Sequence, residues 1–168
     1  AGLLQDICSN LRMDLAGKTI LLMGAGGAAR GVMLPLLQAK PHQVVIANRT
    51  FGRAQALAQQ FQRYGLVVAT TYTRLTSGFD VIINATSASL GGEVPPLPAV
   101  VWQDCSLAYD MMYANALTPF LLQAEQAGVT QLADGLGMLV EQAAEAFTVW
   151  RGVRPETASV LHALRQQG

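Results

Sequence analysis

The chain has 168 residues, of which 51% are hydrophobic and only 13% are charged, against a usual charged share of about 25%. Its eleven basic and eleven acidic residues cancel to a formal net charge of zero. This composition excludes an intrinsically disordered chain, and it argues against a nucleic-acid binder, which needs an excess of basic residues. The sequence therefore predicts a globular domain with a sizeable apolar core.

Short apolar runs alternate with longer helical patterns along the whole chain, after an opening helix expected over residues 3–11. The expected strands are Thr19–Met23, Gln43–Asn48, Leu66–Thr70, Val81–Asn84, Ser106–Asp110 and Gln131–Asp134. The later helices are expected from Thr50, a possible cap, to Tyr64, from Thr118-Pro119 to Gly128, over Gly137–Trp150 and over Pro155–Gln166. Such alternation predicts an α/β fold of Rossmann type, a doubly wound parallel six-stranded sheet in the order 3-2-1-4-5-6 with helices on both faces.

Two places do not fit a regular pattern. Pro35 lies inside the helix expected after the first strand, where a proline costs about 3 kcal/mol or kinks the axis. Residues 91–98 hold two glycines and three prolines, so we expect an ordered loop there.

The clearest motif is a glycine-rich turn between the first strand and its helix. Residues 24–29 read Gly-Ala-Gly-Gly-Ala-Ala, which satisfies the pattern G-x-G-x-x-G/A. Gly24 allows the tight turn, Gly26 lets the backbone approach a pyrophosphate, and Ala29 keeps the helix close to the strand. The alternative is a glycine turn that only packs a helix on a sheet. Because the flanking strand and helix are both expected, we favour dinucleotide binding.

The end of the second strand indicates which dinucleotide is bound. NAD binders carry an Asp or Glu there for the ribose 2′-hydroxyl. Here the strand ends in Asn48, Arg49 and Thr50, with Arg53 in the first turn of the next helix. Two guanidinium groups suit a 2′-phosphate, so we expect NADP. The alternative is an ordinary solvated pair of arginines.

Cysteine and histidine are too few for a disulfide framework or a metal site. Cys8 and Cys105 form no C-x-x-C pair, and His42 and His162 lack metal-ligand spacing. The sequence shows no secretory signal and no apolar run of about 20 residues for a membrane span. We expect a cytoplasmic protein with reduced thiols and no metal, nucleic acid or membrane partner.

Six segments carry a more specific pattern. They read Gly-Ala-Gly-Gly-Ala-Ala-Arg-Gly at 24–31, Asn-Arg-Thr-x-x-Arg-Ala at 48–54, Ile-Ile-Asn-Ala-Thr-Ser at 82–87, Tyr-Asp-Met-x-Tyr at 109–113, Thr-Pro-Phe at 118–120 and Asp-Gly-Leu-Gly-Met-Leu-Val-x-Gln-Ala-Ala at 134–144. In this order they resemble shikimate dehydrogenase over essentially the whole chain. Glutamyl-tRNA reductase shares a glycine loop and an Asn-Arg-Thr-like turn, but not the last segment.

The resemblance implies a role for each matching residue. The pyrophosphate would be held by Gly24, Ala25, Gly26, Gly27 and Ala28, and the adenosine 2′-phosphate by Asn48, Arg49, Thr50 and Arg53. The nicotinamide would be bordered by Met111 and Gly135, with Asn84, Ala85 and Thr86 nearby. Tyr113 and Gln142 would face the substrate. Simple packing is the alternative for Met111 and Tyr113, and a solvated helix position is the alternative for Gln142.

Members of the family also carry an N-terminal substrate domain, whose Lys–Asp pair serves the alcohol proton. Oxidising a hydroxyl requires such a positioned base. The only two lysines here are Lys18, at the opposite end of the first strand, and Lys40, after a helix. We therefore expect no catalytic residue in this chain. Residues 1–168 would form the NADP-binding Rossmann-like domain, with residues 1–16 leading in from a substrate domain that is absent.

The activity implied for the parent enzyme is reversible NADPH-dependent reduction of 3-dehydroshikimate to shikimate, in the chorismate pathway of aromatic amino-acid biosynthesis. The chain alone is expected to bind NADP and to turn over little or nothing. One alternative is a quinate/shikimate dehydrogenase of mixed cofactor use, which an acidic residue in place of Arg49 would have favoured. Another is a stand-alone NADP-binding regulatory module.

Overall fold

The structure, a computed structural model, describes residues 2–88 and 96–166. Most of the loop expected at 91–98 lies outside the described residues. The chain divides into two compact units. The larger comprises residues 15–134, and the smaller combines residues 1–14 with residues 135–168.

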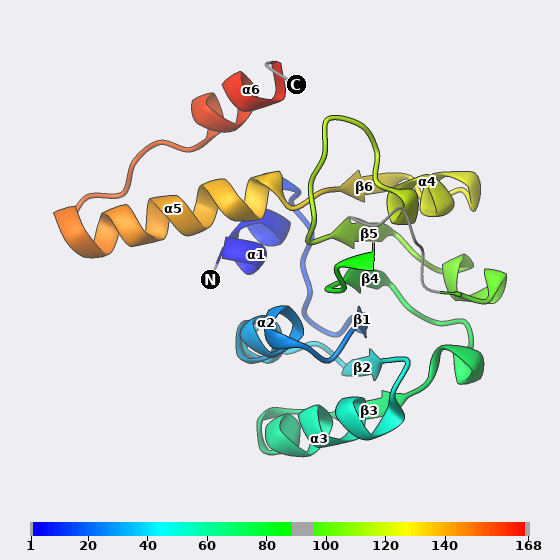
Figure 1. Cartoon of the computed structure of the whole chain (residues 1–168). Coiled ribbons are helices and arrows are strands. Elements are labelled where there is room, and N and C mark those ends of the chain that lie inside the picture. The colour runs from blue at the N-terminus through cyan, green and yellow to red at the C-terminus, as the bar shows by residue number, and fades with distance from the viewer. Residues whose placement is uncertain (1, 89–95, 167–168) are drawn as a thin grey trace. The chain divides into compact units, whose positions relative to one another are not determined.

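The larger unit is built on one six-stranded sheet. Its strands are β1 (Thr19–Met23), β2 (Gln43–Ala47), β3 (Val67–Thr70), β4 (Val81–Asn84), β5 (Leu107–Asp110) and β6 (Gln131–Ala133). They pair in the order β3-β2-β1-β4-β5-β6, and every pairing is parallel. Figure 1 shows this order running from β3 at the bottom to β6 at the top. The expected Rossmann-type fold class and strand order are confirmed.

The helices α2 (Gly27–Gln38) and α3 (Phe51–Phe61) are the crossovers between β1, β2 and β3, and each buries one apolar stripe. Alternate strand residues point to opposite faces of the sheet. One face carries an apolar cluster that includes Leu21, Met23, Val45, Ala47, Tyr72, Leu75, Ile82, Val101, Trp102, Ala108, Phe120 and Leu121. This cluster joins the strands to the 3₁₀ turns η3 (Tyr72–Arg74) and η5 (Ala99–Trp102) and to helix α4 (Pro119–Gln126). Both faces of the sheet therefore bury apolar side chains.

Helix α2 runs through Pro35 instead of ending before it. Proline cannot donate to the carbonyl four residues earlier, which belongs to Gly31. Gly31 is exposed, so water can satisfy that carbonyl. The cost of the proline is thus reduced at this position.

Replacing Gly31 by alanine is expected to stabilise the protein by about 0.5–1 kcal/mol, because alanine loses less backbone entropy than glycine in a helix. A Cβ at this position would meet nothing within 4 Å. Chemical denaturation monitored by circular dichroism measures the change. A lower midpoint in the variant would contradict the expectation.

Two expected helix caps have different outcomes. Thr118 caps α4, since its Oγ1 accepts from the N–H of Leu121 at 3.3 Å and Pro119 takes the first helical position. Thr50 occupies the N-cap position of α3, but its side chain makes no capping hydrogen bond. Instead Asn48 Nδ2 donates to the Thr50 carbonyl at 2.9 Å. The expected capping by Thr50 was therefore wrong, and α3 also ends earlier than expected, passing into the 3₁₀ turn η2 (Gln62–Tyr64).

The smaller unit is helical. Its opening helix α1 (Gly2–Gln5) continues as a π-helix, η1 (Asp6–Asn10), and both contact the long helix α5 (Leu136–Arg151). A last helix, α6 (Ala158–Gln166), begins later than Pro155 and buries none of its residues. None of the helices in residues 2–88 and 96–166 is long and apolar enough to cross a membrane.

Candidate functional site

Four loops of the larger unit meet at the carboxyl edge of its sheet. Backbone hydrogen bonds join them, from Gly24 N to the Ala47 carbonyl at 2.8 Å, from Ala85 N to the Met23 carbonyl at 2.9 Å and from Met111 N to the Asn84 carbonyl at 2.9 Å. The strand register places Met23 beside both Ala47 and Asn84. Most of the site residues expected from the sequence are thus neighbours, at the edge where open α/β sheets bind ligands.

The backbone conformation at position 24 requires glycine. Its φ of +101° lies in the left-handed region, which favours glycine. A Cβ there would also lie 3.1 Å from Thr86 Cγ2 and 3.2 Å from the Ala85 carbonyl oxygen. Position 24 therefore holds the β1–α2 turn tightly against the loop that follows β4.

Gly26 and Gly27 differ from Gly24, because a Cβ at either position would meet nothing within 4 Å. Both are exposed, as is Ala28, whereas Ala29 is fully buried. Helix α2 begins here with no side-chain cap and no acidic residue in its first turn. The first N–H groups of α2 and the positive end of its dipole are therefore not covered by any side chain at Gly26 or Gly27. This arrangement fits a bound phosphate.

Arg49 and Arg53 flank the start of α3, and both are exposed. Neither forms an ion pair with any described residue, and α3 has no acidic residue in its first turn. Arg49 is close enough to Tyr72 to affect its phenol. Burial raises the pKa of Tyr72, and the positive charge of Arg49 opposes that rise. The edge beyond β2 therefore presents two cations uncompensated by a paired carboxylate.

The loops after β4 and β5 are held together by Asn84 and Asp110, both fully buried. Asn84 Nδ2 donates to Asp110 Oδ1 at 3.2 Å, and Asn84 Oδ1 accepts from the N–H and hydroxyl of Thr86 at 3.1 and 2.7 Å. Asp110 also accepts from Met112 N at 3.0 Å and from the Thr118 hydroxyl at 2.6 Å. These contacts position the backbone of Ala85 and Met111, and Asp110 satisfies the turn that follows β5.

The residues expected on the nicotinamide and substrate sides are divided between the units. Met111 is 7% exposed directly after β5, and Tyr113, two residues on, is 52% exposed. Gly135 is the N-cap of α5 in the smaller unit, and Gln142 is an exposed position of the same helix. The structure thus brings the loops after β1, β2, β4 and β5 together in the larger unit, while Gly135 and Gln142 are described only within the smaller one.

Sequence reasoning missed the residue next to Gln142. Glu141 is 1% exposed, and its carboxylate accepts from Arg154, Thr157 and Asn10. A glutamate among apolar helix positions gives no signal of such partners, because they lie outside its own helix, between 13 and 131 positions away in the chain.

Neither lysine lies at the carboxyl edge of the sheet. Lys18 Nζ forms an ion pair with Asp80 at 3.3 Å, and the two residues directly precede β1 and β4 at their amino ends. Lys40 follows the C-terminus of α2. The described residues also hold no group of three or more histidine, cysteine, aspartate or glutamate side chains arranged for a metal ion.

Comparison with known proteins identifies the family. The family model described as shikimate/quinate 5-dehydrogenase matches residues 5–91, and the model of the shikimate 5′-dehydrogenase C-terminal domain matches residues 135–165. These two matches include the glycine loop, the arginine turn and α5.

Named relatives agree over nearly the whole chain. A shikimate dehydrogenase (NADP(+)) of Aeromonas salmonicida is 57% identical over 99% of this chain and 60% of its own length. One of Chromobacterium violaceum is 53% identical over 98% of this chain and 61% of its own length. The crystal structure of an Ael1 enzyme from Pseudomonas putida superposes with a TM-score of 0.92, at 51% identity, over 97% of this chain and 60% of that one.

The chain therefore spans about three fifths of the relatives it matches. The family model alone covers more than half of its residues. The chain belongs to the shikimate/quinate 5-dehydrogenase family.

Proposed function

We propose that this chain is the NADP-binding part of a cytoplasmic shikimate dehydrogenase, which reduces 3-dehydroshikimate to shikimate with NADPH. The observation that carries the proposal is the pairing of two features at one sheet edge. Helix α2 begins at Gly26 and Gly27 without a side-chain cap. Arg49 and Arg53, which have no acidic partner among the described residues, follow the neighbouring strand β2. The first feature suits a pyrophosphate, and the second suits the extra phosphate that distinguishes NADP from NAD.

The residues divide the cofactor between them. Gly24 to Ala28 would hold the pyrophosphate through backbone N–H groups, with Asn48, Arg49, Thr50 and Arg53 around the adenosine 2′-phosphate. Asn84, Ala85, Thr86, Met111 and Gly135 would border the nicotinamide, whose chemistry when bound is hydride transfer. Buried Asn84 and Asp110 then act by fixing the loops that line that ring. Tyr113 and Gln142 would contact the substrate.

We further propose that a substrate domain completes the active site. The chain spans about 60% of the length of its relatives, so those proteins have room for such a domain. The smaller unit also exposes large apolar side chains. Trp150 is 85% exposed and Val149 is 78% exposed, and α6 exposes Val160 and Leu164. We assign these exposed side chains of α5 and α6 to contact with the substrate domain.

Replacing Arg49 by alanine is expected to weaken NADPH binding about ten- to a hundredfold, because a hydrogen bond to a charged group contributes about 1.5–3 kcal/mol. Binding of NADH, which lacks the 2′-phosphate, should hardly change. Isothermal titration calorimetry with both cofactors measures the two dissociation constants.

Arg63→Ala is the matched control, because Arg63 is also an exposed arginine but lies in the turn after α3, over the ring of Tyr64. It should bind both cofactors as the unmodified chain does. Equal losses of NADPH and NADH affinity in Arg49→Ala would contradict the assignment of NADP.

A further inference from the structure

We propose that Gly2 is a positioning residue for Gln142, and that the packing of α1 and η1 on α5 sets the position of the Gln142 side chain. The inference rests on the proposed function, which gives Gln142 its contact with the substrate. Every contact involved lies within the smaller unit.

The first observation is how closely Gly2 approaches α5. A Cβ at position 2 would collide with Gln142 Cγ, with the Met138 carbonyl oxygen and with Gln142 N. The last two atoms face each other across one turn of the helix. Glycine at position 2 therefore lets the backbone of α1 lie directly against the turn that carries Gln142, with the stem of its side chain alongside.

A second close approach lies further along the same pair of segments. A Cβ at Gly137 would collide with the carboxylate of Asp6, which is 3% exposed. Asn10 Nδ2 donates to Asp6 Oδ1 at 2.8 Å and to Glu141 Oε1 at 3.2 Å. The opening segment is thus joined to α5 both by close contact at two glycines and by the hydrogen bond from Asn10 to Glu141.

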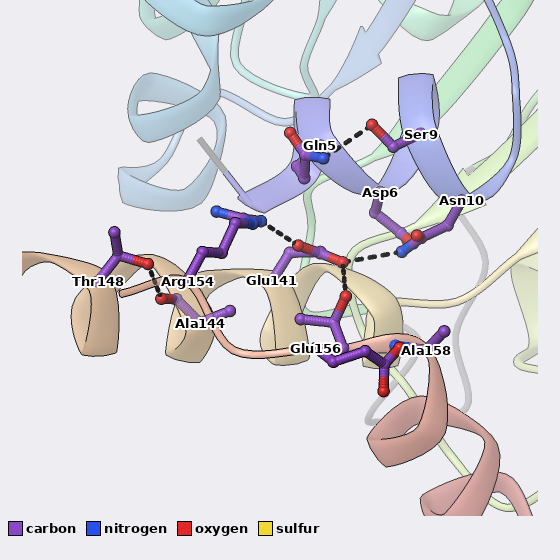
Figure 2. A network of polar contacts seen from close by, with 11 residues as sticks. Gln5, Asp6, Ser9, Asn10, Glu141, Ala144, Thr148, Arg154, Glu156 and Ala158 are labelled. Carbon is purple, nitrogen blue, oxygen red and sulfur yellow. Dashed lines mark hydrogen bonds and ion pairs between the residues drawn. The ribbon is translucent and has the colours of Figure 1, made fainter. Parts of the chain in front are cut away.

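Glu141 connects α5 to the chain that follows it as well. Arg154 donates to its Oε2 at 2.5 Å, and Thr157 donates to its Oε1 at 2.8 Å. Figure 2 shows Arg154 and Asn10 both contacting the Glu141 carboxylate. A buried carboxylate satisfied by three donors fixes the rotation of its helix, since losing a donor leaves part of its hydrogen-bonding capacity unsatisfied. Glu141 directly precedes Gln142.

These contacts decide how freely Gln142 moves. An unrestrained glutamine on a helix surface loses rotamer freedom when it binds a ligand, and that loss weakens binding. With its stem against Gly2 and its turn held through Glu141, Gln142 is ordered before the substrate arrives. The contacts therefore favour substrate affinity without touching the substrate.

The test is a double-mutant cycle in the enzyme with its substrate domain, assayed with shikimate and NADP. The variants are Gly2→Ala, Gln142→Ala and the double variant, with Gly31→Ala as the glycine control. We expect Gly2→Ala to raise the KM for shikimate by up to about tenfold, the value of one neutral hydrogen bond, with the KM for NADP unchanged. The double variant should be no worse than Gln142→Ala alone, because Gly2 acts through Gln142.

The inference would be overturned if the double variant showed the product of the two single effects on the KM for shikimate. It would also be overturned if either single variant left that KM unchanged. These outcomes leave the proposed cofactor and reaction intact, although an unchanged KM in Gln142→Ala would also remove the substrate contact assigned to that residue. The proposed function fails separately if the unmodified enzyme does not oxidise shikimate.

Should Gly2→Ala not fold, Asn10→Ala provides the same test, because it removes the hydrogen bond from η1 to Glu141 of α5, together with the bond to Asp6 within η1, without adding an atom. It should raise the KM for shikimate and again show no further effect in Gln142→Ala. An Asn10→Ala effect that multiplies with Gln142→Ala would overturn the inference.

Discussion

Replacing Gly26 by valine is expected to abolish NADPH binding while leaving the folding transition of the chain nearly unchanged. The two effects separate because of where Gly26 lies. Its φ of −90° and ψ of −164° are extended backbone that a β-branched residue adopts without strain, and a Cβ there would meet nothing within 4 Å. The folded chain therefore has room for the side chain, apart from a helix-capping cost of about 1 kcal/mol at most.

The same open space is what the pyrophosphate needs. A valine at the N-cap of α2 would stand between a ligand and the first N–H groups of the helix, so that those groups could no longer reach phosphate oxygens. Fluorescence titration with NADPH measures binding, and thermal unfolding measured with the same sample tests folding. A variant that keeps both its transition and its NADPH affinity would show that the glycine loop is only structural.

Two other glycines make the comparison specific. Gly31→Val adds the same side chain to an open position further along α2, and it should bind NADPH normally. Gly24→Ala should lose binding and stability together. Its φ of +101° disfavours a side chain, and the Ala85 backbone is too close to accept one. Loss of binding alone indicates a glycine that contacts the ligand, whereas loss of binding and stability together indicates a glycine required for packing.

The sheet could be predicted from the sequence because its strands are continuous apolar runs. Parallel strands buried on both faces have this pattern, and the glycine turn after Met23 fixes which strand comes first at the ligand edge. The edge residues follow directly, since the carboxyl ends of neighbouring parallel strands lie side by side. Asn48, directly after β2, and Asn84, at the end of β4, therefore stand at the same edge of the sheet.

Side-chain partners could not be predicted in the same way. Thr50 has the residue type and position of an N-cap, yet its carbonyl is engaged by Asn48 and its hydroxyl does not cap α3. Glu141 appears to be an ordinary helix glutamate until Asn10, 131 positions away in the chain, is seen to donate to it. Local patterns specify elements, whereas contacts between distant segments depend on how those elements pack.

The chain alone is expected to bind NADPH and yet to show no shikimate oxidation above background. The reaction requires a base at the carbinol, and proton transfer by a positioned group contributes typically 10²–10⁴-fold. Lys18 is engaged with Asp80 at the amino ends of the strands, and Lys40 follows α2. Losing the substrate domain would remove substrate positioning as well, which contributes further.

Tyr109 and Asp110, two titratable groups near the carboxyl edge, are poor substitutes for that base. Tyr109 is fully buried within β5, and both carboxylate oxygens of Asp110 accept hydrogen bonds from Met112, Asn84 and Thr118. The measurement is a steady-state assay with shikimate and NADP, using the chain alone and the chain mixed with a separately expressed substrate domain. Activity that returns only in the mixture would support the division of labour, because the cofactor site and the base then come from different domains. Robust activity of the chain alone would contradict it and would require a base within these 168 residues.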